Sequence, residues 1–166
     1  MKKKHPFSLL LCLVCLVLLL SNNHPVKAQD SVIQLTETSV NVTKIAEDLH
    51  VPWEILWGPD DWIWITQRNG IISRLNPSTG QLIDLITVEE VYEYSESGML
   101  GMVLHPDFTN NPYVYVVYNY YDGANVEKLV RFTYDGTSLG SPYTLMQDIN
   151  CSNGGNHSGS RLLILP

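Results

Sequence analysis

The sequence predicts an all-β protein with β-propeller architecture, and three observations support this prediction. Short runs of β-branched and aromatic residues alternate with turn residues from Trp53 onward, as they do in consecutive strands. These runs fall into two sets of four, and the first set, residues 53–88, leaves no room for a helix. The sets repeat after 47 residues, measured from Gly58 to His105. A four-strand unit that recurs at about 40–50 residues is typical of propeller blades.

The first set of four runs is separated by residues that favour turns. Gly58-Pro59-Asp60-Asp61 follows the first run, Asn69-Gly70 follows the second, and Asn76-Pro77-Ser78-Thr79-Gly80 follows the third. Asn-Gly between two apolar runs is a strong hairpin signal, because both residues adopt the backbone that a tight turn requires. The predicted strands of this set are Trp53–Trp57, Trp62–Thr66, Ile71–Leu75 and Leu82–Val88.

The second set repeats the first and suggests the beginning of a third. Its predicted strands are Met99–Leu104, Tyr113–Tyr120, Lys128–Tyr134 and Tyr143–Ile149. The first of them ends in His105-Pro106-Asp107, which repeats the Pro-Asp closure of the first set, and Ile164-Leu165-Pro166 resembles a third copy cut at the proline. We therefore expect about two blades and the first strand of a third, at residues 161–165. An eight-stranded sandwich is the alternative, but it does not account for the repeated closure.

The N-terminus has the composition of a secretory signal peptide, which we assign to residues 1–28. Three lysines precede an apolar run of 14 residues from Phe7 to Leu20, and Val26 and Ala28 supply small residues for cleavage after Ala28. The run is short compared with the ~20 residues of a membrane-spanning helix, so an uncleaved anchor is the less favoured alternative. We expect an exported protein, periplasmic or extracellular, with no stable membrane span. Residues 29–50 form a polar leader with room for one strand.

The composition of the mature chain excludes several classes of function. Without residues 1–28 the chain carries six Lys and Arg against 17 Asp and Glu, a formal charge of −11. Nucleic-acid partners are disfavoured, because binding to phosphate backbones depends on Lys and Arg. Cys151 is the one cysteine outside the signal peptide, so no internal disulfide can form. We interpret Cys151 as a small residue in a turn rather than as a reactive thiol.

A histidine in a glycine-rich loop near the C-terminus is the main candidate for chemistry. His157 lies within Gly154-Gly155-Asn156-His157-Ser158-Gly159-Ser160-Arg161-Leu162. Glycines let a backbone approach a ligand closely, and an imidazole exchanges protons near neutral pH. Histidines in such loops are more often structural than catalytic, so the local pattern alone does not assign a base.

The order of six motifs resembles the N-terminal part of the glucose/sorbosone dehydrogenase family. The resemblance extends over residues 50–166, and no single motif is specific by itself. The motifs are Val51-Pro52-Trp53-Glu54-Ile55, Gly58-Pro59-Asp60, Ile63-Trp64-Ile65-Thr66-Gln67-Arg68-Asn69-Gly70, Glu96-Ser97-Gly98-Met99-Leu100-Gly101, His105-Pro106-Asp107-Phe108 and Asn156-His157-Ser158-Gly159-Ser160-Arg161-Leu162.

This resemblance implies an exported six-bladed propeller that oxidises an aldose at its anomeric carbon. In the family a histidine base takes the hydroxyl proton and hydride passes to pyrroloquinoline quinone (PQQ), which calcium polarises. The resemblance assigns the base and a cofactor contact to His157, a second cofactor contact to Glu96 and a sugar contact to Asn156. It implies a sugar substrate and an electron acceptor as partners. The cationic and calcium-binding residues have no counterpart up to Pro166, so we assign no metal ligand here and expect this piece to be inactive.

Several competing interpretations fit the same residues. Glu96 fits a solvated loop carboxylate equally well, and His105 fits a blade corner better than a ligand. Tryptophans that alternate along strands are more often core residues than sugar platforms. A non-catalytic propeller that binds carbohydrate or protein at the cell surface is the main functional alternative, and a truncated product without its own function is the third.

Overall fold

The computed structural model describes residues 30–165, which separate into two units at Thr43. The first unit, as far as it is described, comprises residues 30–43, and the second comprises residues 44–165. The expected signal peptide at residues 1–28 lies outside the described residues, and so does Pro166.

The first unit is a β-hairpin. β1 (Asp30–Gln34) pairs antiparallel with β2 (Ser39–Thr43), and the Leu35 amide donates a hydrogen bond to the Thr38 carbonyl at 2.8 Å to close the turn. The sequence suggested a single strand in this leader, and the structure has two. Val32 and Ile33 before the turn and Val40 and Val42 after it are β-branched residues that favour strands. All side chains of β2 are exposed.

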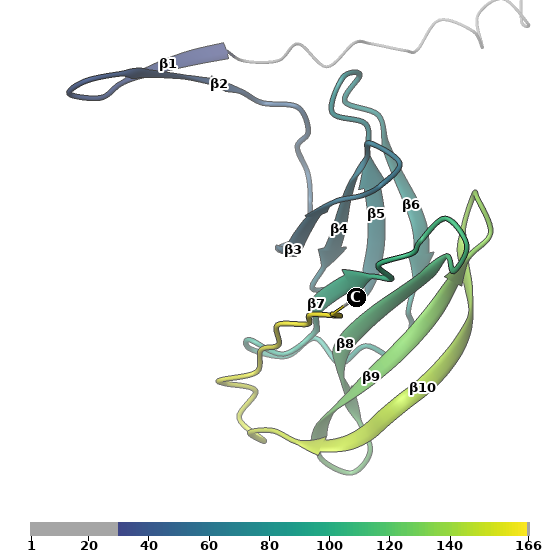
Figure 1. Ribbon diagram of the computed structural model, residues 1–166. Helices are drawn as coiled ribbons and strands as arrows, with labels where there is room; N and C mark the ends of the chain where they lie inside the picture. The colour runs from purple at the N-terminus through teal and green to yellow at the C-terminus, as the bar shows by residue number, and fades with distance from the viewer. Residues whose placement is uncertain (1–29, 166) are drawn as a thin grey trace, which may run out of the picture. The chain divides into compact units, whose positions relative to one another are not determined.

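The second unit consists of two four-stranded antiparallel sheets whose strands follow one another in chain order (Figure 1). The strands of the first sheet are β3 (Pro52–Trp57), β4 (Ile63–Gln67), β5 (Ile71–Leu75) and β6 (Leu82–Thr87). Those of the second sheet are β7 (Met99–Leu104), β8 (Tyr113–Tyr121), β9 (Asn125–Tyr134) and β10 (Leu139–Asn150). Two successive four-stranded meanders are the arrangement of propeller blades, which confirms the predicted fold class.

The two Pro-Asp motifs occupy equivalent positions, because each connects the first and second strands of its sheet. In the first sheet Asp60 accepts hydrogen bonds from the Trp62 amide at 3.3 Å and from Trp64 Nε1 at 3.0 Å. In the second sheet the Asp107 amide donates to His105 Nδ1 at 3.1 Å. The 47-residue repeat in the sequence therefore corresponds to a repeat of structure.

The segment expected to begin a third blade runs beside β7 (Figure 1). The amide of Gly101 in β7 donates to Ser160 Oγ at 3.0 Å, and a Cβ on Gly101 would come within 2.6 Å of the Ser160 carbonyl oxygen. Residues 161–165 are not in a strand. The two predicted four-stranded blades are thus present, and the strand expected at residues 161–165 is not formed.

The core lies between the two sheets and draws on both. Trp64 of β4 is fully buried, and its ring meets Phe108 and Tyr134 edge-on at centroid distances of 5.6 and 5.2 Å. Strands β3 and β4 of the first sheet contact β7 of the second. Buried residues from both sheets complete the cluster: Ile72, Leu85, Val88, Met99, Met102, Val114, Val116, Tyr118, Val130, Phe132 and Leu139. Packing between the two sheets thus fixes the strand ends from which the connecting loops extend.

Within residues 30–165 there is no helix with the length and apolar character needed to cross a membrane.

Candidate active site

Three connections meet at one end of the second sheet. Residues 88–98 lead into β7, residues 122–124 join β8 to β9, and residues 151–160 follow β10. The strand register places them together, because Met99 pairs with Tyr118, Tyr121 pairs with Asn125, and Asn150 pairs with Val126. The sequence-predicted residues Glu96, Asn156 and His157 all lie in these connections.

The structure brings the three predicted site residues together. Glu96 Oε2 accepts a hydrogen bond from the backbone amide of His157 at 2.7 Å, across 61 residues of sequence. The Glu96 amide donates to the carbonyl of Gly155 at 3.0 Å. The neighbouring Ser95 hydroxyl donates to Asn156 Oδ1 at 2.8 Å. Glu96 therefore does not behave as an unattached loop carboxylate, because it fixes the backbone of the loop that carries His157.

The loop approaches its support so closely that one position requires glycine. Gly155 is buried, has a φ of +72°, and would place a Cβ only 2.6 Å from the carbonyl oxygen of Tyr94. His157 also lies in the left-handed region, with a φ of 63°. Histidine is among the non-glycine residues found there most often, so its backbone is uncommon but accessible. The tight contact at Gly155 sets the direction in which the chain leaves toward His157.

Gly155→Ala is expected to displace this loop and destabilise the protein. Alanine at a positive φ costs about 1–2 kcal/mol by itself, and the clash with Tyr94 adds about 1–3 kcal/mol. Gly136→Ala is the matched control, because Gly136 has a φ of +100° and no atom within 4 Å of a built Cβ. Denaturant unfolding of both variants of the full-length protein measures the difference. Equal losses of stability would show that the contact between Gly155 and Tyr94 is not tight.

A buried network of hydrogen bonds connects the loop that carries His157 to the second sheet. Asn119 of β8 is completely buried, and its Oδ1 accepts the Gly98 amide at 3.1 Å. Its Nδ2 donates to Asn125 Oδ1 at 3.1 Å and to Ser158 Oγ at 3.4 Å. Ser97, also fully buried, contacts Ser158 through their hydroxyls at 3.1 Å. This one asparagine thus links the segment that carries Glu96 to the segment that carries His157.

Two further titratable groups belong to this network. Cys151 Sγ donates to the carbonyl of Asn125 at 2.9 Å, and burial together with nearby Glu127 raises the pKa of its thiol. A raised pKa disfavours the reactive thiolate, in agreement with a structural role. Burial also raises the pKa of the Glu127 carboxyl, although hydrogen bonds from Asn119 and the Gly159 amide favour its charged form. Through these hydrogen bonds Cys151 connects the start of the loop to β9, and Glu127 of β9 accepts the amide of Gly159 near the end of the loop.

An arginine next to the loop is exposed although its partner is buried. Arg161 Nη1 donates to Glu54 Oε1 at 2.6 Å, and its guanidinium lies 5.2 Å from the centroid of the Trp53 ring. The Arg161 side chain is 75% exposed, whereas that of Glu54 is 9% exposed. Arginine has five N–H donors, so most of them stay available to a ligand.

Sequence reasoning did not identify Asn119, Ser97 or Arg161 as parts of the site. Asn119 carried a signal, because an asparagine stands inside an otherwise Val- and Tyr-rich strand. Ser97 and Arg161 lie inside the family motifs, but their partners are distant in sequence and only folding reveals them.

The remaining candidates lie elsewhere or in the core. The ring of His105 packs against Tyr113 and Tyr115 at the opposite end of the second sheet, as expected for a corner residue. Trp64 is fully buried, whereas Trp57 is 63% exposed, so the interpretation of the tryptophans as core holds for the first and not for the second. No group of three or more His, Cys, Asp or Glu within residues 30–165 is arranged to bind a metal ion.

Comparison with known proteins places this geometry in a family context. Residues 49–166 match the family described as glucose/sorbosone dehydrogenase. Quinoprotein glucose dehydrogenase B of Acinetobacter calcoaceticus is 34% identical over 134 residues, which cover 74% of this chain and 28% of that protein.

Two solved structures share the fold. A Thermus thermophilus protein, provisionally described as an oxidoreductase (glucose dehydrogenase), superposes with a TM-score of 0.64 at 32% identity, over 70% of this chain and 35% of the other. The PQQ-bound aldose sugar dehydrogenase of Streptomyces coelicolor superposes with a TM-score of 0.56 at 26% identity, over 74% and 35% of the two chains. The chain therefore spans about a third of the length of the relatives it matches.

Proposed function

The chain belongs to the glucose/sorbosone dehydrogenase family, and we therefore propose that the full-length protein is an exported, PQQ-dependent aldose dehydrogenase. It would oxidise a sugar at its anomeric carbon. The observation that supports this function best is the 2.7 Å bond from the His157 amide to Glu96. That bond holds a histidine on an exposed loop through its backbone, and the imidazole ring makes no hydrogen bond or ion pair within residues 30–165. The related quinoprotein and the PQQ-bound structure supply the cofactor class.

In this proposal each residue of the loop has a separate role. The His157 imidazole accepts the proton of the anomeric hydroxyl as the hydrogen on the same carbon leaves with two electrons, which forms the carbonyl of a lactone. Glu96 positions the base through the backbone and does not itself exchange a proton with the sugar. Asn156 lies next to the base and presents an amide that can bond a sugar hydroxyl.

The described residues include one cationic group that suits a carboxylate of a quinone cofactor. PQQ carries three carboxylates, and the exposed guanidinium of Arg161 keeps donors free beside its single bond to Glu54. When bound, the quinone would accept the hydride that the sugar loses. We place the other cationic residues and the calcium ligands outside this chain, and we propose that residues 29–166 alone do not turn over sugar.

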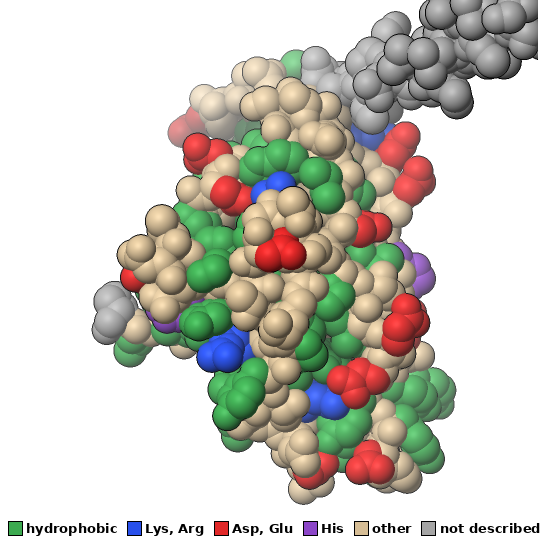
Figure 2. All heavy atoms as spheres, turned by 90° about the vertical axis from the view of Figure 1, so that its right-hand side faces the viewer, with side chains coloured by type: hydrophobic (Ala, Val, Ile, Leu, Met, Phe, Trp, Pro, Cys, Tyr) green, Lys and Arg blue, Asp and Glu red, His purple; other side chains and the backbone are tan. Residues whose placement is uncertain are grey.

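The surface charge agrees with a neutral substrate. Acidic side chains are spread over the face shown in Figure 2, with few basic ones among them. A nucleic acid would be repelled from such a surface, whereas an aldose carries no charge and PQQ would be held locally by Arg161.

Reconstitution of the full-length protein tests the proposed function. The purified protein, loaded with PQQ and Ca²⁺, is expected to reduce its quinone when glucose or another aldose is added, as followed by absorbance. Protein without PQQ is the control and should show no change. Failure to bind PQQ would contradict the proposal and would favour a non-catalytic, carbohydrate-binding propeller.

A further inference from the structure

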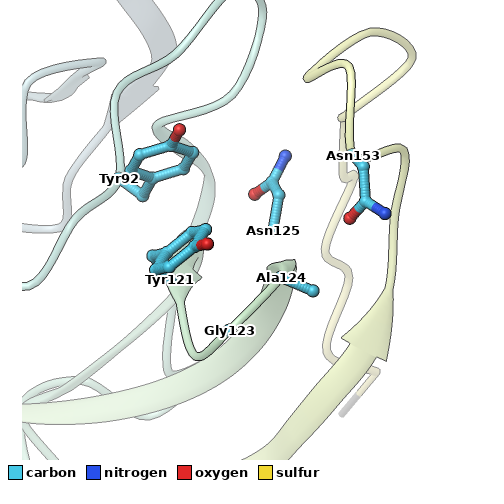
Figure 3. A pocket seen from close by; sticks show the side chains of 6 residues that line it. All are labelled: Tyr92, Tyr121, Gly123, Ala124, Asn125 and Asn153. Atoms are coloured by element: carbon cyan, nitrogen blue, oxygen red, sulfur yellow. The ribbon is translucent and has the colours of Figure 1, made fainter.

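A small pocket next to the His157 loop has no role in the reaction described above. Its volume is about 190 Å³, and it lies at the same end of the second sheet (Figure 3). The connection before β7, the β8–β9 turn and the segment after β10 all contribute to it. It is lined by Tyr92, Tyr121, Gly123, Ala124, Asn125 and Asn153.

One wall of the pocket is an aromatic platform. Tyr92 lies between two other tyrosines, with ring centroids 5.8 Å from Tyr94 in a stacked pair and 5.3 Å from Tyr121. Tyr94 is 50% exposed and Tyr121 is 62% exposed, so their ring surfaces are open to solvent. Stacking of an apolar ligand face on such exposed rings is favourable, because it buries the aromatic surface.

The opposite wall carries amides and no charge. Figure 3 shows Asn125 and Asn153 across the pocket from the two tyrosines. The Asn125 amide has no free donor for a ligand, because it donates to Ser97 Oγ and to the Ser152 carbonyl. The Asn153 side chain is exposed and makes no hydrogen bond within residues 30–165. None of the six lining residues is charged, which points to a neutral ligand with an apolar face and hydroxyl groups.

The pocket is close to the proposed base. Asn153 precedes His157 by four residues, a stretch that spans at most about 14 Å. Tyr92 likewise precedes Glu96 by four residues, and Tyr94 touches the loop through its carbonyl beneath Gly155. A sugar oxidised at His157 could therefore extend a second ring into this pocket.

We infer that the Tyr92–Tyr121 pocket is a subsite for the sugar ring adjacent to the one that is oxidised. The ligand class is a reducing disaccharide or longer oligosaccharide, with one pyranose face on the tyrosines and its hydroxyls toward Asn153. This assignment rests on the proposed function for the ring at His157, but the pocket's own affinity for sugar is measurable without any turnover.

Filling the pocket is the sharpest test. Gly123 has a φ of +74° and no atom within 4 Å of a built Cβ, so Gly123→Asn adds a side chain at the pocket without a clash. Asparagine tolerates this backbone conformation. Gly136→Asn is the matched control, because Gly136 also has a positive φ and open surroundings, but lies in the β9–β10 turn at the other end of the sheet. Both variants are made in the full-length protein in a bacterial host.

Calorimetric titration of the quinone-free protein with glucose, maltose and cellobiose gives the readout. We expect at least one disaccharide to bind more tightly than glucose, roughly five- to tenfold for one additional stacked ring. Gly123→Asn should remove this advantage, and Gly136→Asn should retain it. Equal affinities for glucose and both disaccharides in the unmodified protein, or an advantage that survives Gly123→Asn, would overturn the subsite. If the subsite is supported but the PQQ-loaded protein oxidises no aldose, the proposed function fails and the sugar-binding pocket stands.

Discussion

His157→Asn in the full-length protein is expected to abolish most aldose turnover while the fold and PQQ binding are retained. Removal of a general base typically lowers the rate by ~10²–10⁴, which corresponds to roughly 3–5 kcal/mol of barrier. Asparagine is the suitable replacement, because the φ of 63° at His157 is one that asparagine accepts readily. Its backbone amide can still bond Glu96, so only the imidazole is lost.

Single-turnover reduction of the bound quinone, at matched quinone occupancy, is the measurement for His157. His157→Gln is the second variant, because it also lacks a base but tolerates a positive φ less well. If the two variants lose turnover equally and unfold differently, the loss belongs to the imidazole and not to the loop backbone. An unchanged single-turnover rate in His157→Asn would end the catalytic assignment.

Trp64→Ala is expected to produce the largest loss of stability. Truncation of a buried tryptophan costs about 3–5 kcal/mol, because apolar contacts are lost and a cavity remains. Trp64 is fully buried where the two sheets meet, and its edge-on contacts with Phe108 and Tyr134 reach into the second sheet. The substitution therefore weakens the packing between blades and not only one strand. The shift of the midpoint in denaturant unfolding measures the effect.

Trp64→Phe is the matched control for this prediction. Phenylalanine keeps an aromatic ring in the core but removes the Nε1 hydrogen bond to Asp60. Asp60 keeps its bond from the Trp62 amide and its ion pair with Arg74 at 3.4 Å, so its carboxylate is not left without partners. We expect a loss of about 1–2 kcal/mol, much of it from the hydrogen bond. Losses of similar size in both variants would contradict the role of Trp64 as a packing centre.

Most strands could be predicted from the sequence because their patterns are local. The predicted bounds of β5 and β7 agree with the structure, and those of β3, β4, β6 and β8 differ by one residue at one or both ends. Strands β9 and β10 begin three and four residues earlier than predicted, and the polar residues Asn125 and Glu127 stand at the start of β9. Both are buried in the strand, where partners distant in sequence satisfy their polar atoms.

The candidate site was only partly predictable. The resemblance to a family identified Glu96, Asn156 and His157, but the sequence contains no information on how they meet. The role of Glu96 in holding the His157 amide depends on a contact across 61 residues. The tyrosine pocket could not be predicted either, because its residues come from three connections whose proximity follows from strand register.

The sequence by itself determined the blade repeat, the turn positions and the acidic character of the chain, since these depend on residue type and on neighbours along the chain. Tertiary structure alone decided which polar residues are buried together, that Gly155 must be glycine, and that Arg161 pairs with Glu54. The physical reason is that burial and close contact arise only when the two sheets pack. A hydrogen bond or a steric clash between distant residues has no local sequence pattern.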